Sequence, residues 1–161
     1  DQTGTWALAM LTISLAVTPV RRLTGWNEVI KLRRMLGLFA FFYACLHLLT
    51  WVVLVSFFDV PTMLDDIAER PFITVGMATF LILLALALTS TKASIRRLGR
   101  KWQQLHRLVY VAAVGAVVHF WWLVKKDIRE PLIFALLLAA ALGARLFFLR
   151  RPVATRRVSA M

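Results

Sequence analysis

Acidic residues and cysteine are scarce in this sequence of 161 residues. It has eight Asp and Glu against 20 Lys and Arg, and a single cysteine, Cys45. One cysteine excludes an intrachain disulfide, and the position of Cys45 inside an apolar run is typical of a small apolar filler. The chain also has no CxxC pair, no glycine-rich nucleotide loop and no Ser-His-Asp set. These absences argue against the common nucleotide-binding, thiol-redox and hydrolase sites.

Charged residues are absent from long stretches of the chain. The sequence is 60% hydrophobic, 17% of its residues are charged, and its mean hydropathy is +0.74. Residues 35–58, MLGLFAFFYACLHLLTWVVLVSFF, contain no charged side chain, and about 20 apolar residues of helix cross a bilayer. Four further stretches have the same character: residues 3–18, 72–91, 108–124 and 132–149. The sequence therefore predicts an all-α fold, a polytopic membrane helix bundle with five visible transmembrane helices in a single domain over residues 1–161.

The basic residues are concentrated on one side of this five-span arrangement. Sixteen of the 20 Lys and Arg lie in segments 20–34 and 92–107 and in the C-terminal part of the chain from residue 145. The opposite connections carry most of the acidic residues: Asp59, Asp65, Asp66, Glu69, Asp127 and Glu130. The positive-inside rule places the basic segments, and with them the C-terminus, in the cytoplasm. The chain has a formal net charge of +12 at pH 7, but this distribution argues against nucleic acid as its partner.

The connections between the spans are short, so we expect any chemistry to lie in the helices or on partners. Residues 94–107, SIRRLGRKWQQLHR, interleave basic residues with Leu and Trp, and predict one interfacial helix on the inner leaflet. Such a basic face usually contacts lipid, and a docking surface for an anionic cofactor or partner is the alternative. On the other side, we expect the acidic loop 59–70 to contribute to docking a partner, with an ordinary solvated surface as the alternative.

All three histidines lie in or at the edge of two predicted spans. His47 is in the second span, and His106 and His119 bracket the fourth. Ionisable groups inside a bilayer are costly and are therefore functional candidates, although a lone transmembrane histidine is often a hydrogen-bonded structural residue. Both helices run outward from the cytoplasm, and His47 and His119 fall at a similar depth. His106 lies about 20 Å below His119 by helix rise.

Two imidazoles at one depth on neighbouring helices can hold one metal centre from both sides. Haem iron suits this arrangement, because it accepts two axial imidazoles and its macrocycle is apolar. Zinc would need Cys or carboxylate ligands, and a proton relay would need an intramembrane carboxylate; the spans supply neither beside the histidines. We predict His47 and His119 as metal ligands of an outer haem b and His106 as the metal ligand of an inner one. The small residues 112–116, AAVGA, and Gly37 would let a flat ring approach, although helix packing alone also explains them.

The two histidine-bearing helices also resemble one another. LRR at residues 32–34 opens one and LHR at residues 105–107 opens the other, with Arg33 where a fourth histidine would stand. Helical phase supports the correspondence only in part. The fourteen residues from Arg33 to His47 return to within about 40° of one face, whereas the thirteen from His106 to His119 end about 140° away from it. We predict that Arg33 contributes to cofactor binding by pairing with a haem propionate, with ordinary positive-inside charge as the alternative.

Five motifs of the chain together resemble the MsrQ (YedZ) family. They are TPVRRLTGW at 18–26, LRRMLGLFAFFYACLHLL at 32–49, RPFITVG at 70–76, TSTKASIRRLGRKWQQLHRLVY at 89–110 and HFWWLVK at 119–125. The resemblance implies the haem-binding membrane subunit of the bacterial periplasmic methionine sulfoxide reductase system, within the ferric reductase-like transmembrane superfamily. It also implies six helices, and because the chain opens with Asp1 rather than Met, we expect a first, N-terminal helix to be missing here.

The same resemblance implies cofactors and partners. Superfamily members carry two paired haem ligands on each of two helices, so Arg33 leaves the second ligand of the inner haem open. The family implies bound FMN, the quinol pool or a flavin reductase as donor, and electron delivery to the periplasmic molybdenum-cofactor reductase MsrP. We therefore expect an electron-transfer subunit in the bacterial inner membrane rather than the catalytic subunit. A self-sufficient transmembrane ferric or cupric reductase and a non-redox transport or structural subunit are the alternatives.

Overall fold

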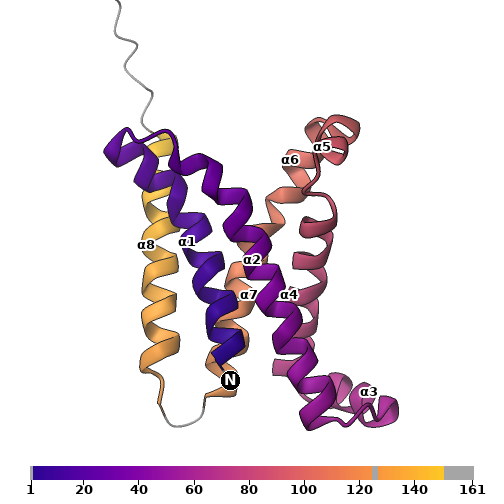
Figure 1. Cartoon of the computed structure of the whole chain (residues 1–161). Helices are drawn as coiled ribbons and strands as arrows, with labels where there is room; N and C mark the ends of the chain where they lie inside the picture. The colour runs from indigo at the N-terminus through magenta and orange to yellow at the C-terminus, as the bar shows by residue number, and fades with distance from the viewer. Residues whose placement is uncertain (1, 125–126, 151–161) are drawn as a thin grey trace, which may run out of the picture.

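Helices make up nearly all of the fold in the computed structural model, which describes residues 2–124 and 127–150 (Figure 1). In this part of the chain, five helices are long and apolar enough to cross a membrane, which confirms the predicted all-α bundle. The spans and the shorter helices are α1 (Gln2–Thr24), α2 (Val29–Thr50) with the π-helical turn η1 (Trp51–Val55), α3 (Val60–Glu69), α4 (Pro71–Leu88), α5 (Lys92–Leu98), α6 (Arg100–His106), α7 (Leu108–Leu123) and α8 (Arg129–Arg150).

The first span is longer than the sequence predicts. We expected it to end at residue 18, before a proline, but α1 continues through Pro19 to Thr24. A proline removes one backbone hydrogen bond without ending a helix whose neighbours hold it in place. Here Leu11 and Leu15, in the two turns before Pro19, are 2% and 1% exposed, so packing compensates for the lost bond.

The basic segment 94–107 forms two short helices, so the prediction of a single interfacial helix is wrong. Helix α5 ends at Leu98 and α6 begins at Arg100, with Gly99 between them at φ +49°. This backbone conformation is favourable only for glycine, which explains the break. Thr91 caps α5 by accepting the Ser94 amide at 3.1 Å. Helix α6 runs on into α7, so it belongs to the fourth span.

The acidic segment 59–70 is also helical, although we expected a loop. Pro61 lies in the first turn of α3, where a missing amide donor costs nothing. Just before this helix, Phe57 and Phe58 both have positive φ, 46° and 61°. Bulky residues rarely adopt such values, so the chain makes its sharp turn from η1 into α3 at a strained position.

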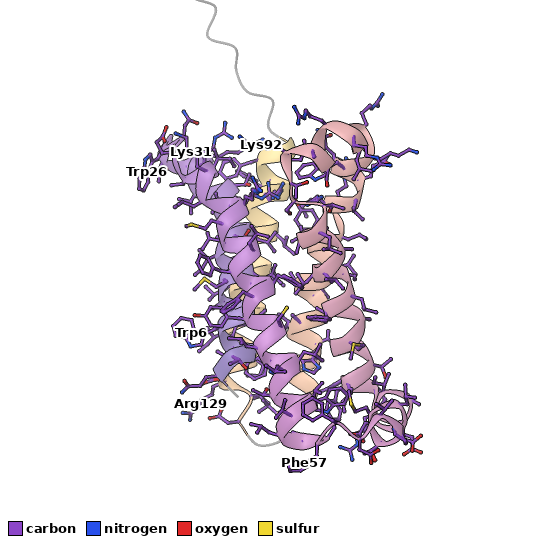
Figure 2. All side chains as sticks on the ribbon, turned by 45° about the vertical axis from the view of Figure 1, so that its right-hand side comes forward. Trp6, Trp26, Lys31, Phe57, Lys92 and Arg129 are labelled. Carbon is purple, nitrogen blue, oxygen red and sulfur yellow. The ribbon has the colours of Figure 1, made fainter. Side chains whose placement is uncertain are left out.

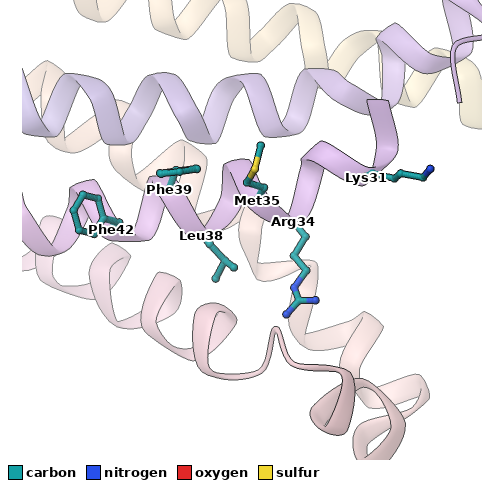
Figure 3. A pocket seen from close by; sticks show the side chains of 6 residues that line it. All are labelled: Lys31, Arg34, Met35, Leu38, Phe39 and Phe42. Carbon is teal, nitrogen blue, oxygen red and sulfur yellow. The ribbon is translucent and has the colours of Figure 1, made fainter. Parts of the chain in front are cut away.

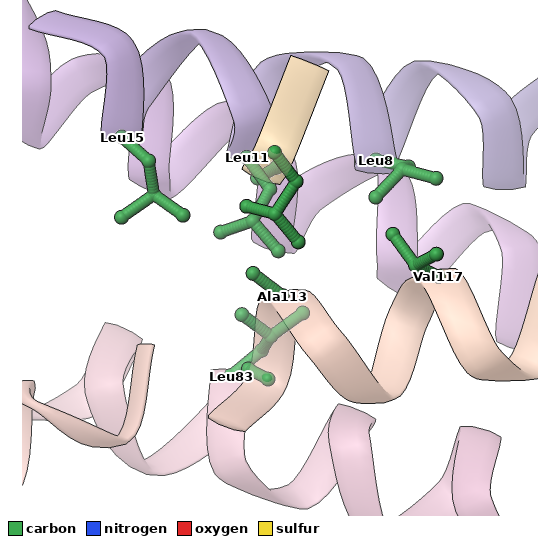
Figure 4. Packing of buried hydrophobic residues seen from close by; sticks show 9 residues of the cluster. Leu8, Leu11, Leu15, Leu83, Ala113 and Val117 are labelled. Atoms are coloured by element: carbon green, nitrogen blue, oxygen red, sulfur yellow. The ribbon is translucent and has the colours of Figure 1, made fainter. Parts of the chain in front are cut away.

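The core lies where α1 and α4 meet α7. Leu8 and Leu11 of α1, Leu83 of α4, and Ala113 and Val117 of α7 are buried in one cluster (Figure 4). Helix α1 packs against α2, α7 and α8, whereas α4 packs mainly against α7. Large apolar side chains are exposed on the outward faces of the spans, as a lipid-facing surface requires.

The two ends of the bundle differ in charge. Segments 21–34 and 92–107 form one end, which we call the basic end; Lys31 and Lys92 mark it in Figure 2. Helix α3 and residues 127–130 lie at the other end, which we call the acidic end (Figure 1). Arg129 marks it in Figure 2. Helix α8 ends at the basic end (Figure 1), and the three remaining tail arginines of the predicted basic segment lie outside the described residues: Arg151, Arg156 and Arg157.

Thiol labelling tests this arrangement and its orientation. In a Cys45→Ala background, Ala68→Cys on α3 and Ala93→Cys on α5 each introduce one exposed thiol. Because the positive-inside rule keeps the basic end in the cytoplasm, a membrane-impermeant maleimide should label Ala68→Cys in intact spheroplasts. Ala93→Cys should react only after permeabilisation. The opposite labelling pattern would reverse the orientation.

Candidate histidine site

The structure brings His47 of α2 and His119 of α7 together at the acidic half of the bundle. Their ring centroids are 6.0 Å apart and the ring planes meet at 75°. A single metal atom bound by one nitrogen of each ring, at about 2.0 Å, would put the ring centres about 6 Å apart. The spacing would therefore allow both rings to bind one metal. The two residues lie at one depth, as helix rise predicts, and their role as ligands stays a prediction.

The His119 ring has a defined tautomer. Its Nδ1 lies 2.7 Å from the backbone carbonyl oxygen of Phe72, at the start of α4. A carbonyl can only accept, so Nδ1 carries the proton and donates it, and Nε2 retains its lone pair. Metal-binding histidines commonly donate their second ring nitrogen in this way. The Phe72 carbonyl therefore prepares His119 to act as a ligand through Nε2.

A glycine lies against each of these two rings. A Cβ added to Gly76 of α4 would stand 2.7 Å from Nδ1 of His119, and one added to Gly4 of α1 would stand 3.1 Å from the His47 ring. The first distance is closer than side chains pack, so the His119 ring depends on the missing side chain of Gly76, and the second contact is tight. The sequence contains no periodic pattern that marks either glycine.

His106 lies apart from this pair, in a corner built by the TST and LHR motifs at the basic end. The Trp102 ring stacks on it with centroids 3.9 Å apart, and Trp102 Nε1 donates to the Thr89 carbonyl at 2.9 Å. His106 Nδ1 lies 3.2 Å from the Trp102 carbonyl, and Nε2 lies 3.4 Å from Ser90 Oγ. The motif that is most specific in the sequence thus fixes the position of His106.

Arg33 lies on the inward side of α2, near His106. Its backbone carbonyl accepts a hydrogen bond from the buried Ser14 hydroxyl at 3.2 Å, and its side chain is half-buried. Its positive charge is close enough to affect both His106 and Arg145. That Arg33 and His106 bind a cofactor together stays a prediction.

Other residues singled out in the sequence serve packing. Ala112 and Ala113 are fully buried in the core, and a Cβ on Gly115 would stand 2.4 Å from Thr79 Oγ1 of α4. A Cβ on Gly37 would meet Ser14 Oγ at 4.0 Å, which is ordinary contact. These small residues let helices approach one another, which favours helix packing over room for a flat ring.

A groove of about 520 Å³ runs along the exposed side of α2, away from the histidines (Figure 3). Its lining is basic toward the basic end and apolar below: Lys31, Arg34, Met35, Leu38, Phe39 and Phe42. These residues recur every three or four positions, so they share one face of the helix. The groove has no His, Cys, Asp or Glu in its lining, and its apolar wall suits contact with lipid.

The histidine arrangement fits haem better than a closed metal site. Among residues 2–124 and 127–150, no three His, Cys, Asp or Glu side chains converge as a metal cluster, whereas a structural zinc site takes four protein ligands. Haem iron would need no more than two protein ligands, which His47 and His119 would supply. The pair of His47 and His119 and the separate His106 are therefore the candidate ligands that this bundle offers to an iron macrocycle.

Comparison with known proteins identifies the class. Residues 3–117 match the family described as ferric reductase like transmembrane component. No solved structure matches the chain significantly. The five-span fold and this match together define a transmembrane domain of the ferric reductase-like class.

Its relatives narrow the class further. The protein-methionine-sulfoxide reductase heme-binding subunit MsrQ of Herminiimonas arsenicoxydans is 52% identical over 149 residues, which cover 91% of this chain and 68% of that protein. The subunit of the same name from Ralstonia nicotianae is 52% identical over 152 residues, covering 92% of this chain and 70% of that protein. That of Xanthomonas euvesicatoria is 49% identical over 159 residues, covering 99% of this chain and 72% of that protein. The chain belongs to the MsrQ family.

Paired glycine substitutions test the contact between Gly76 and His119. Alanine is favoured over glycine in a helix by about 0.5–1 kcal/mol, so Gly143→Ala, where the added Cβ meets nothing within 4 Å, should not lower the thermal midpoint of the purified protein. Gly76→Ala should lower it, because overpacking costs about 1–3 kcal/mol. Equal midpoints for the two variants would show that the His119 ring moves away freely.

Proposed function

We propose that this chain is a membrane subunit that binds haem b and passes electrons across the bilayer to a periplasmic methionine sulfoxide reductase. The observation that carries the proposal is the pair of His47 and His119, whose ring centroids are 6.0 Å apart in the apolar part of the bundle. Family membership supports it, because the relatives are named as heme-binding subunits of protein-methionine-sulfoxide reductase. Haem bound at this position supplies one-electron transfer.

The chain's own residues bind and orient the cofactor in this proposal. His47 and His119 each offer one ring nitrogen, and the Phe72 carbonyl fixes the His119 ring by accepting its Nδ1 proton at 2.7 Å. Gly4 and Gly76 leave room for the two rings. At the basic end, His106 offers a second site, held by Trp102 and with Arg33 nearby. Two sites near opposite ends of α4 and α7 give electrons a route through the bundle.

The charge difference between the two ends of the bundle supports an electron route from the cytoplasm to the periplasm. In our proposal the basic end faces the cytoplasm of a bacterial inner membrane, so the C-terminus is cytoplasmic, His106 is the entry site and the His47/His119 pair is the exit site. The exit site lies at the half of the bundle that carries α3, where an acceptor in the periplasm would dock. We propose the molybdenum-cofactor reductase MsrP as that acceptor, on the strength of the family resemblance.

The electron donor and a flavin are the remaining parts of the proposal. FMN and either the quinol pool or a flavin reductase follow from the family resemblance alone. The basic end is the part of the chain whose charge suits a flavin phosphate. Its groove on α2 combines Lys31 and Arg34 with an apolar wall, which suits contact with lipid headgroups and chains.

Alanine substitution of the histidines tests the pairing. His47→Ala and His119→Ala should each remove or convert the same low-spin haem in reduced-minus-oxidised absorption spectra, and the double variant should lose little more than either single one. Such non-additivity is expected when two residues act as one unit. His106→Ala should leave that haem in place and perturb a different one.

Three results would contradict the proposal at different levels. A folded protein purified without haem bands would favour the non-redox transport or structural alternative. Matching losses in His47→Ala and His106→Ala, with His119→Ala unaffected, would keep haem binding but overturn the pairing. Electron delivery to ferric or cupric ions rather than to MsrP would favour the self-sufficient reductase.

Charge neutralisation on α3 tests the docking surface at the acidic end. Asp65 and Glu69 are exposed, whereas Asp66 pairs with Arg70 at 3.0 Å and its side chain is only 14% exposed. Asp65→Asn with Glu69→Gln should slow electron delivery to MsrP roughly two- to fivefold at low salt, where surface charge is least screened. Asp66→Asn is the control with an intramolecular partner and should have a smaller effect. Unchanged rates at low salt would leave α3 as a solvated surface.

A further inference from the structure

Arg145 of α8 is a cation for which residues 2–124 and 127–150 provide no ion pair. Its guanidinium lies over the Tyr110 ring, with Cζ 5.1 Å from the centroid. The Nη1 atom is buried and has no hydrogen-bond partner among the described residues. The charges of Arg33 and Arg22 act on it as well. Three guanidinium groups thus gather at the basic end, where like charges repel and a shielded, unpaired donor is costly.

The basic end offers no carboxylate to neutralise them. Glu28 is the only acidic residue between positions 2 and 58, and there is none from 71 to 126 or from 131 to 161. Glu28 is exposed and forms an ion pair with Lys31. The described residues therefore offer Arg145 no carboxylate, and we look to a bound group for the anion that balances it.

The surroundings of Arg145 indicate which anion. Tyr110 follows His106 by four residues, so the two side chains share one face of the helix that runs from α6 into α7. Arg145 sits over the Tyr110 ring, and Arg33 acts on both Arg145 and His106. Arg145 therefore rests on a residue that lies about one helical turn beyond the proposed inner ligand.

We propose that Arg145 binds a propionate carboxylate of the haem held at His106, with Tyr110 as the surface on which its guanidinium rests. The proposal depends on the function proposed above and adds a residue that the family match over residues 3–117 does not reach. It also gives α8 a part in the inner site, which otherwise consists of residues from α2, α6 and the turn after α4.

The test compares the affinity of the chain for haem with its affinity for haem dimethyl ester, in which both propionates are neutral. The difference between the two affinities reports the contact with the carboxylate. The full-length chain is prepared without haem and titrated by absorbance with each compound, and the binding phase that His106→Ala abolishes is followed. Arg145→Met should weaken haem binding in this phase about tenfold or more, the effect of losing a hydrogen bond to a charged group. Binding of the ester should change less than twofold. Arg145→Lys, which keeps the charge, should retain the preference for haem.

Controls separate the possible failures. Arg21→Met removes an exposed arginine that bonds to Asn27 at the same end, and should leave both affinities unchanged. No haem binding by the unsubstituted chain would refute the proposed function itself. Equal weakening of haem and ester by Arg145→Met, in a variant whose helical content is normal, would make Arg145 a packing residue. Unchanged haem binding with loss of co-purified phospholipid or FMN would assign the site to a phosphate. Either result overturns the carboxylate proposal.

Discussion

The close approach of α4 and α7 determines the geometry of both histidine sites. Gly115 meets Thr79 in the middle of this contact, and Gly76 meets His119 near the acidic end. The same two helices end beside Ser90 and His106 at the basic end. A larger side chain at Gly115 or Gly76 would separate the helices, and the separation would move His119 away from the Phe72 carbonyl and from His47. Small residues therefore shape the site although they offer no ligand atom themselves.

The apolar surroundings explain how polar groups are arranged along the bundle. His119 and Thr12 bond to backbone carbonyls of the helices, because water is not at hand in the bilayer core. The histidines and the half-buried Arg33 and Arg145 are the main ionisable groups within the spans. All of them lie near one of the two proposed cofactor positions. Placing an ionisable group in a membrane span costs free energy, and cofactor binding would explain why these residues are there.

The spans and the histidine pair could be predicted from the sequence, because composition and helix rise are local properties. Counting residues along the two helices was enough to place His47 and His119 at the same depth in the membrane. The contact of Gly76 with His119 could not be predicted, since it depends on how α4 and α7 are aligned. Gly99 and Pro61 were visible as residues, but whether they break or begin a helix depends on the neighbouring packing. Arg145 looked like ordinary positive-inside charge, and only its burial over Tyr110 distinguishes it.

The two helices that carry His47 and His119 pack mainly on other helices rather than on each other, and this affects how stable the chain is in the cell. Helix α2 packs on α1 and α4, and α7 packs on α4, α8 and α1. A group held by both His47 and His119 acts as a cross-link between them. Binding of this kind stabilises the folded state by mass action, by about 2.7 kcal/mol when the free ligand is at 100 times its Kd. The amount of protein that survives proteolysis should then follow the supply of haem during synthesis, so cofactor availability would set abundance as well as redox competence.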